Sequence, residues 1–210
     1  SHRYIAFGDV NNLDLGHYGV LSEDSIHLTS IINLRASGDS LENYTGVMRL
    51  FQIRMDRPGV DTLRLNNNVL SSDLKDETQR DIQLRSSLAN MAIDGNFRIN
   101  EAIQIGQRIA KEVNLYIRND DTLITNYYAE KEIIPTNVIL HDTIVTKRGL
   151  NPFLEFLRIP AYVQPGTQAT LTMIHDGIDQ VMLGLESDTL RYQDIQIYGQ
   201  FVDFLLEKRE

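Results

Sequence analysis

Residues 26–55 read IHLTSIINLRASGDSLENYTGVMRLFQIRM, two alternating apolar and polar runs around a polar middle. In the first run the apolar residues share one parity: Ile26, Leu28, Ile32 and Leu34. In the second run they again share one parity: Val47, Phe51, Ile53 and Met55. This alternation is typical of half-buried strands, and residues 37–46 have the Ser, Gly, Asp and Asn content of a loop. We therefore expect a long N-terminal β-hairpin over 26–55.

The sequence on either side of this hairpin predicts further short strands. Before it, residues 3–7 predict a strand that ends in a turn at Gly8–Asp9. After it, Pro58–Gly59 predicts a turn, and residues 62–65 predict a third strand.

The spacing of apolar residues then changes and favours helices. Ser71, Ser72 and Asp73 are N-cap candidates, and Asp94–Gly95 is a typical helix stop. Positions at helical spacing follow the cap: Leu74, Thr78, Ile82, Arg85, Ala89 and Ala92. A second seam has the same spacing: Ile103, Gly106, Ala110, Val113 and Ile117. We expect a helical hairpin over 72–118, with helices at 72–93 and 100–118, packed on a sheet.

The β pattern returns in a C-terminal region over 122–206. Short strands are expected at 122–128, 138–140 and 143–146, and residues 151–157 favour a helical turn. Asp176–Gly177 between alternating runs is the signature of a type I′ hairpin turn. A second turn is expected at 186–188.

Helices grouped in one block between strands predict an α+β fold, and the length suits a single domain over 1–210. The expected architecture is a set of antiparallel β-sheets, arranged as a sandwich or jelly roll, with an inserted two-helix hairpin.

The composition excludes several classes of function. The chain has no Cys, so disulfides and thiolate metal sites are excluded. No apolar run is long enough to span a bilayer and no signal peptide is visible, so a soluble chain is expected, with its compartment undecided. The net charge of −9 disfavours direct binding of nucleic acid.

The motifs do not assign a catalytic site. Gly38–Leu41 reads GDSL and resembles the signature block of the GDSL hydrolases, in which the Ser is the nucleophile and a later Asp-x-x-His supplies its base. No Asp lies three residues before His175, the last His, so a loop is the favoured interpretation. The other His are scattered, and no phosphate-binding loop is present. We therefore predict no metal and no cofactor.

The basic residues favour a role in association. Arg outnumbers Lys 15 to 5, and interfaces are enriched in Arg because a guanidinium is easily desolvated and binds carboxylates with two hydrogen bonds. We predict four interface residues in the N-terminal strands: Arg35, Arg49, Arg54 and Arg64. The partner would be a second copy of the chain or another protein.

The leading hypothesis is a non-catalytic structural subunit that forms homo-oligomers, as in a virus or phage particle. Two alternatives stay open. One is a carbohydrate- or peptide-binding β-domain that uses Tyr side chains as platforms: Tyr44, Tyr127, Tyr128 and Tyr162. The other is a hydrolase whose site is assembled from distant residues.

Overall fold

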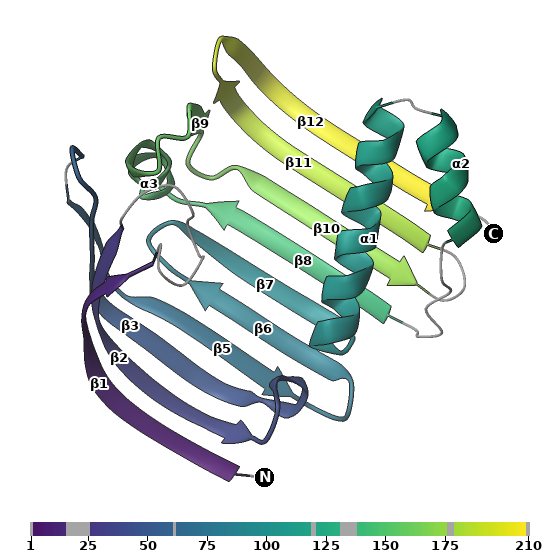
Figure 1. Cartoon of the computed structure of the whole chain (residues 1–210). Helices are drawn as coiled ribbons and strands as arrows, with labels where there is room; N and C mark the ends of the chain where they lie inside the picture. The colour runs from purple at the N-terminus through teal and green to yellow at the C-terminus, as the bar shows by residue number, and fades with distance from the viewer. Residues whose placement is uncertain are drawn as a thin grey trace.

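A computed structural model describes residues 2–15, 26–60, 62–118, 121–130, 138–175 and 179–208. The strands in these ranges form one antiparallel sheet in the order β1-β2-β3-β5-β6-β7-β8-β10-β11-β12, with β4 on β3 and β9 on β11 (Figure 1). The first six are β1 (His2–Asp14), β2 (His27–Gly38), β3 (Thr45–Asp56), β4 (Leu63–Leu65), β5 (Asn68–Leu74) and β6 (Gln79–Arg85). The other six are β7 (Ala89–Asn96), β8 (Val138–Thr146), β9 (Ala161–Val163), β10 (Gln168–His175), β11 (Asp179–Tyr192) and β12 (Ile195–Lys208).

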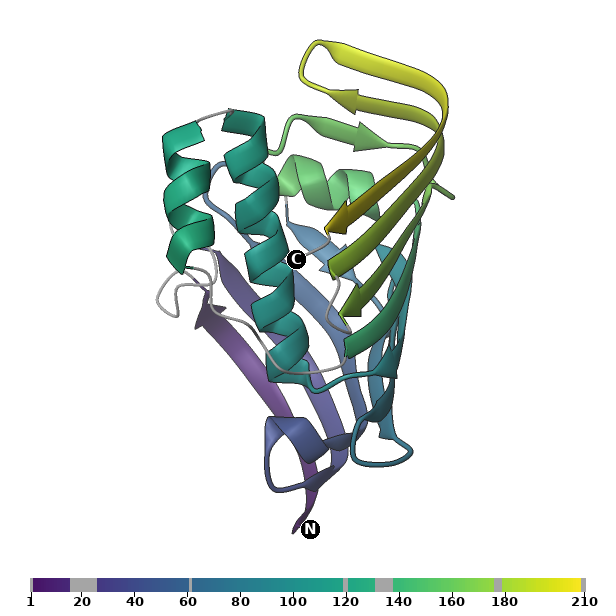
Figure 2. The ribbon, with the colours of Figure 1, turned by 90° about the vertical axis from the view of Figure 1, so that its right-hand side faces the viewer.

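The expectation of antiparallel β structure is confirmed. The stacked sheets of a sandwich or jelly roll are not confirmed, because the described strands all belong to one sheet that curves around a helix (Figure 2). That helix is α1 (Ile99–Arg118), followed by α2 (Asp121–Glu130), and both precede β8. We call the face that α1 covers the inner face and the opposite face the outer face.

The main core lies between α1 and the inner face. Ile105 of α1 is 0% exposed and packs with residues of three strands and of the segment before α1: Phe97, Val138, Leu140, Met173 and Val181. The predicted helix at 100–118 is confirmed as α1, but the predicted seam is not the face that meets the core. Ala102, Ile105 and Ile109 pack in the core, whereas Ile103 is 49% exposed.

A side chain from elsewhere in the chain caps the N-terminus of α1. The Glu42 carboxylate accepts the backbone N–H groups of Ile99 and Asn100, each at 2.8 Å. A negative charge at this end of a helix also interacts favourably with the helix dipole. Arg80 is 1% exposed and holds the same loop in place, donating to the carbonyls of Tyr44 and Glu42. Burial lowers the pKa of its guanidinium, and the charge of Glu42 opposes that shift.

A second core joins the N-terminal strands to α3 (Leu150–Phe156). Its buried residues come from β3, β4, α3 and the start of β2: Ile26, Ile53, Met55, Leu63, Leu65 and Phe156. The predicted strand at 62–65 and the helical turn at 151–157 are therefore confirmed as β4 and α3.

The predicted hairpin over 26–55 is confirmed as β2 and β3, with one change of face. Thr29 pairs with Arg54 and Ile31 pairs with Phe51, so β3 contains one extra residue at this point. Gln52 occupies the bulge with φ 50°, and Ser30 donates to the Phe51 carbonyl at 3.1 Å. The bulge reverses the alternation, so Ile53 and Met55 face inward whereas Phe51 faces outward.

The predicted helix at 72–93 is wrong, and with it the helical hairpin over 72–118, because these residues lie in β5, β6 and β7. Residues four apart share one face of a strand as well as of a helix, so Leu74, Thr78 and Ile82 did not distinguish the two. The segment between β5 and β6 forms a hairpin turn, in which the Asp76 carboxylate accepts the N–H groups of Thr78 and Gln79.

Three smaller expectations are also corrected. Residues 122–128 are helical in α2, and β1 continues past Gly8–Asp9 to Asp14. No turn interrupts β11 at 186–188, because the buried Ser187 hydroxyl bonds Thr167 at 2.6 Å within the sheet. The chain turns after Tyr192, and the Asp176–Gly177 turn lies outside the described residues.

Candidate functional site

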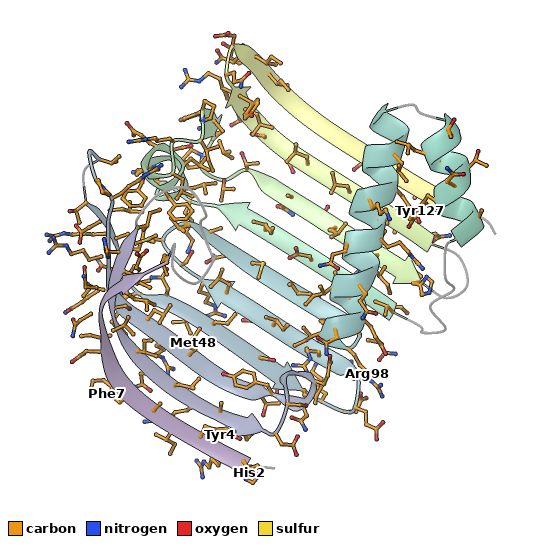
Figure 3. All side chains as sticks on the ribbon, in the orientation of Figure 1. His2, Tyr4, Phe7, Met48, Arg98 and Tyr127 are labelled. Atoms are coloured by element: carbon orange, nitrogen blue, oxygen red, sulfur yellow. The ribbon has the colours of Figure 1, made fainter. Side chains whose placement is uncertain are left out.

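Strand β1 forms one end of the described sheet and is exposed along most of its length. It pairs with β2 on one side, and the sheet order of the described residues starts with it. Every residue from His2 to Asp9 is exposed, including Tyr4 at 48%, Ile5 at 70% and Phe7 at 74% (Figure 3). A long apolar edge strand with unpaired backbone groups is a surface on which another strand can dock.

The two faces of β1 carry different chemistry. Pairing with β2 places Arg3, Ile5, Phe7 and Asp9 on the outer face, so a basic residue and an acidic residue flank two large apolar ones. The inner face carries Tyr4, Ala6 and Gly8. The two ends of the outer face of β1 therefore carry opposite charges, with the apolar pair Ile5 and Phe7 between them.

The pairing of β1 with β2 is regular from His2 to Val10 and then shifts. A bulge with φ 54° at Asn12 separates this stretch from the next pair, Leu13 with Leu28. The edge available to a partner in regular register is thus the nine-residue stretch from His2 to Val10.

All four predicted interface arginines lie on the outer face, on β2, β3 and β4. Arg54 pairs directly with Arg64, and the bulge at Gln52 places Arg54 on the same face as Arg49. Arg35 is the diagonal neighbour of Arg49, because Asn33 pairs with Arg49. The structure therefore gathers them on one surface, and their role in an interface stays a prediction.

One of these arginines is already paired within the chain. Arg54 Nε lies 2.8 Å from an oxygen of Asp56, which also accepts a hydrogen bond from Thr62 at 2.6 Å. The Thr62 hydrogen bond and the Arg54 charge hold the pKa of the Asp56 carboxyl below its usual value. A groove of about 420 Å³ lies beside this pair, lined by Thr29, Gln52, Ile53, Arg54, Arg64 and Asn66.

The opposite end of the sheet, β12, also exposes large apolar residues. Ile195 is 64% exposed, Tyr198 64% and Leu205 61%. Both ends of the described sheet order thus carry apolar side chains that nothing in the described residues covers fully.

A buried polar cluster lies beneath the C-terminal half of α1. Glu112 is 3% exposed and His175 is 5% exposed. Tyr127 of α2 donates its hydroxyl to Glu112 at 3.0 Å, and Arg108 Nη2 lies 3.4 Å from His175 Nδ1. These contacts link α1 to α2 and to β10. Sequence reasoning did not find Arg108 and Glu112, although their positions three and seven residues after Ile105 put them on its face of the helix.

Tyr127, one of the predicted Tyr platforms, has another role in the structure. Tyr127 is engaged in the cluster beneath α1, and Lys111 lies 4.7 Å from its ring centre. Tyr127 and Tyr128 lie in the helix α2 and not in the strand that was expected at 122–128. Burial raises the pKa of the Tyr44 hydroxyl, and nothing is described of the Tyr128 side chain.

Tyr162 lines a pocket of about 520 Å³ between α3, β9 and the β11–β12 turn. The Arg191 guanidinium lies 5.9 Å from its ring centre, and its hydroxyl donates to Gln164 at 3.1 Å. Arg158, with φ 57°, also lines the pocket. A tyrosine with two guanidinium groups could bind a polar or anionic ligand.

The GDSL stretch begins at Gly38, the buried last residue of β2, and continues into the connection to β3, where Asp39 and Ser40 are exposed. The Asn43 side-chain oxygen accepts the N–H groups of Asp39 and Ser40 at 2.8 and 2.9 Å. The Asn43 Nδ2 group donates to the Asp39 carboxylate, and this hydrogen bond lowers the pKa of that carboxyl. Ser40 borders a groove of about 560 Å³ whose lining includes carboxylates and Arg98 but no imidazole. Among the described residues, no hydrogen bond joins Ser40 to a histidine, and no three His, Asp or Glu could hold a metal ion.

No protein-family model, no curated protein and no solved structure matches the chain. Within the described ranges, no helix has the length and apolar character needed to cross a membrane.

Proposed function

We propose that the chain is a non-catalytic assembly subunit that forms homo-oligomers through the edge of its sheet. The observation that carries this proposal is β1, a strand at the end of the described sheet whose Ile5 and Phe7 are about three-quarters exposed. An exposed apolar strand edge of this kind pairs readily with another chain that has free backbone groups.

Association through β1 would recover free energy from two sources. The N–H and C=O groups on the side of β1 away from β2, which no described strand pairs with, would gain partners, and burying apolar area yields roughly 25 cal/mol per Å². The outer-face arginines beside β1 extend the same surface, with Arg35 directly next to Ile5 on β2. A virus or phage particle is one assembly in which a chain of this kind would serve.

Size-exclusion chromatography with light scattering tests the proposal. The chain has a mass of 24.0 kDa, and we expect a larger species at tens of micromolar that dissociates on dilution. Salt should weaken the association where Arg–carboxylate contacts contribute, since exposed ion pairs are screened. A particle of 24.0 kDa at every concentration and at both low and high salt would refute the assembly role.

The Tyr162 pocket favours a second candidate function, the binding of a carbohydrate or peptide. Tyr162 supplies an aromatic face, and Arg158 and Arg191 supply donors around it. We would expect an array of glycans and peptides to identify a ligand whose binding is lost in Tyr162→Ala and kept in Tyr198→Ala, a control on β12. Equal binding by both variants would exclude this pocket.

A further inference from the structure

The geometry points to a two-fold symmetric dimer in which β1 pairs antiparallel with β1 of a second copy, centred on Ala6. This inference rests on the proposed assembly function and specifies its partner and its register. Both sheets would then continue into each other through β1, with the outer faces of the two copies on the same side.

The two-fold symmetry restricts the possible registers. In an antiparallel pair, residues opposite each other either both point their backbone groups into the shared ladder or both point them away. Opposed residues must therefore have the same parity, and the two residue numbers must add to an even sum. The candidate registers are thus centred on a residue, such as Ile5, Ala6 or Phe7.

The register centred on Ala6 matches charge with charge and apolar with apolar on the outer face. Arg3 lies opposite Asp9 of the second copy, and Ile5 lies opposite Phe7 of the second copy. By symmetry each pair occurs twice. The result is a central apolar group of four side chains, flanked at both ends by an ion pair.

The neighbouring registers lose this complementarity. Centring on Ile5 places Arg3 opposite Phe7, and centring on Phe7 places Ile5 opposite Asp9. In both cases a charge faces an apolar side chain.

The inner face supports the same register independently. Tyr4, 48% exposed, would lie opposite Gly8 of the second copy. A Cβ built on Gly8 meets nothing within 4 Å, so the space above this glycine is open to the Tyr4 ring. Aromatic residues opposite a strand glycine cover the backbone that the glycine leaves exposed.

The bulge at Asn12 also falls outside this register, because the pairs from Arg3 with Asp9 inward use only residues that pair regularly with β2.

Charge reversal tests the ion pairs. Arg3→Glu alone or Asp9→Arg alone replaces two attractive pairs by two repulsive ones, and we expect dimer affinity at low salt to fall about 10- to 100-fold. The double variant Arg3→Glu/Asp9→Arg restores opposite charges in this register and should recover most of the affinity. Arg35→Glu, on the adjacent strand, is the matched single-charge control and should weaken the dimer less. Failure of the double variant to recover would overturn the inference.

Cysteine crosslinking tests the centre, and the chain has no Cys to interfere. In an Ala6→Cys variant the two thiols face each other across the two-fold, with Cα atoms about 4.5–5.5 Å apart, within the range of a disulfide. In a Tyr4→Cys variant they lie four residues apart, about 13 Å, which is too far. We expect oxidation to give a covalent dimer from Ala6→Cys and none from Tyr4→Cys, whereas a mixture of Tyr4→Cys and Gly8→Cys should crosslink.

The outcomes separate this inference from the proposed function. If the protein oligomerises but Ala6→Cys does not crosslink, the register is wrong and the assembly role stands, with β1 against β12 as the arrangement to test. If the chain is a monomer at all concentrations, both fail. Circular dichroism and thermal unfolding of each variant show whether the fold is retained.

Discussion

Ile105 and Phe7 are both large apolar side chains, but α1 buries Ile105 completely whereas β1 leaves Phe7 74% exposed. Ile105 contacts residues of the main core that lie far apart in the sequence, and Phe7 lies on a strand that pairs with one strand among the described residues. The same kind of residue thus contributes to the stability of one chain in the first region and would contribute to association between chains in the second. Four predictions test this difference.

The largest effect is expected in the main core between α1 and the inner face. Ile105→Ala should lower the free energy of unfolding by about 2–5 kcal/mol, because it leaves a cavity in the main core. Urea denaturation measures this loss. The matched control on the same helix is Ile103→Ala, 49% exposed, which should change stability by no more than about 0.5 kcal/mol. Equal losses in both variants would contradict the burial of Ile105.

On the exposed strand β1 a substitution should weaken association and leave the stability of the monomer unchanged. Phe7→Ser should weaken self-association about 100-fold, since each dimer loses two phenyl rings worth roughly 1.4 kcal/mol each. Unfolding of the monomer should be unchanged. Ile195→Ser, 64% exposed on β12, is the control from the other edge and should leave the dimer intact. Sedimentation velocity distinguishes the variants, and a stronger effect of Ile195→Ser would assign the interface to β12.

An intermediate effect is expected at Glu42, whose loop caps the N-terminus of α1. Glu42→Ala should cost about 1–2 kcal/mol, because the first N–H groups of α1 lose their acceptor and Arg80 loses a nearby charge. Glu42→Gln keeps an acceptor oxygen and should cost less. Hydrogen exchange should localise the loss to the first turn of α1, and uniform exchange changes would contradict the cap.

The smallest effect concerns the charge of the Asp142 carboxyl on β8. Burial raises the pKa of the Asp142 carboxyl, whose Oδ1 has no hydrogen-bond partner among the described residues. The folded chain therefore binds this proton more tightly than the unfolded chain does, and stability falls as the pH rises through the raised pKa. Asp142→Asn should be more stable by about 1 kcal/mol at pH 8.

This advantage of Asp142→Asn should vanish below pH about 4, where the carboxyl is protonated in both states. Thermal unfolding across this pH range measures it. A constant difference between the two proteins at every pH would show that the charge of Asp142 is not its cause.

Local pattern identified much of the secondary structure. The hairpin of β2 and β3, the short strand β4 and the helix α1 follow from alternation or from helical spacing, because each has a residue order that only one period explains. The segment 72–93 failed for the opposite reason. Its spacing of four is compatible with both periods, and pairing with neighbouring strands determined the outcome.

The candidate surface was only partly predictable. The four arginines are all in the N-terminal strands, as expected. Strict alternation puts Arg54 on the face opposite to Arg49, because the two positions have opposite parity, and it does not reveal the bulge that aligns them. The sequence of β1 shows its charges and apolar residues, but not that the strand lies at the end of the sheet. That position depends on the pairing of every other strand.

By itself the amino-acid order determined the mostly antiparallel β character, the position of α1 and the lack of thiol chemistry, because these depend on residue type and short-range period. The tertiary structure alone decided which apolar residues are covered. It placed Glu42 on the first turn of α1, 57 residues away in sequence, and it left Ile5 and Phe7 exposed at the edge. Burial depends on which distant segments meet, and no local spacing encodes that.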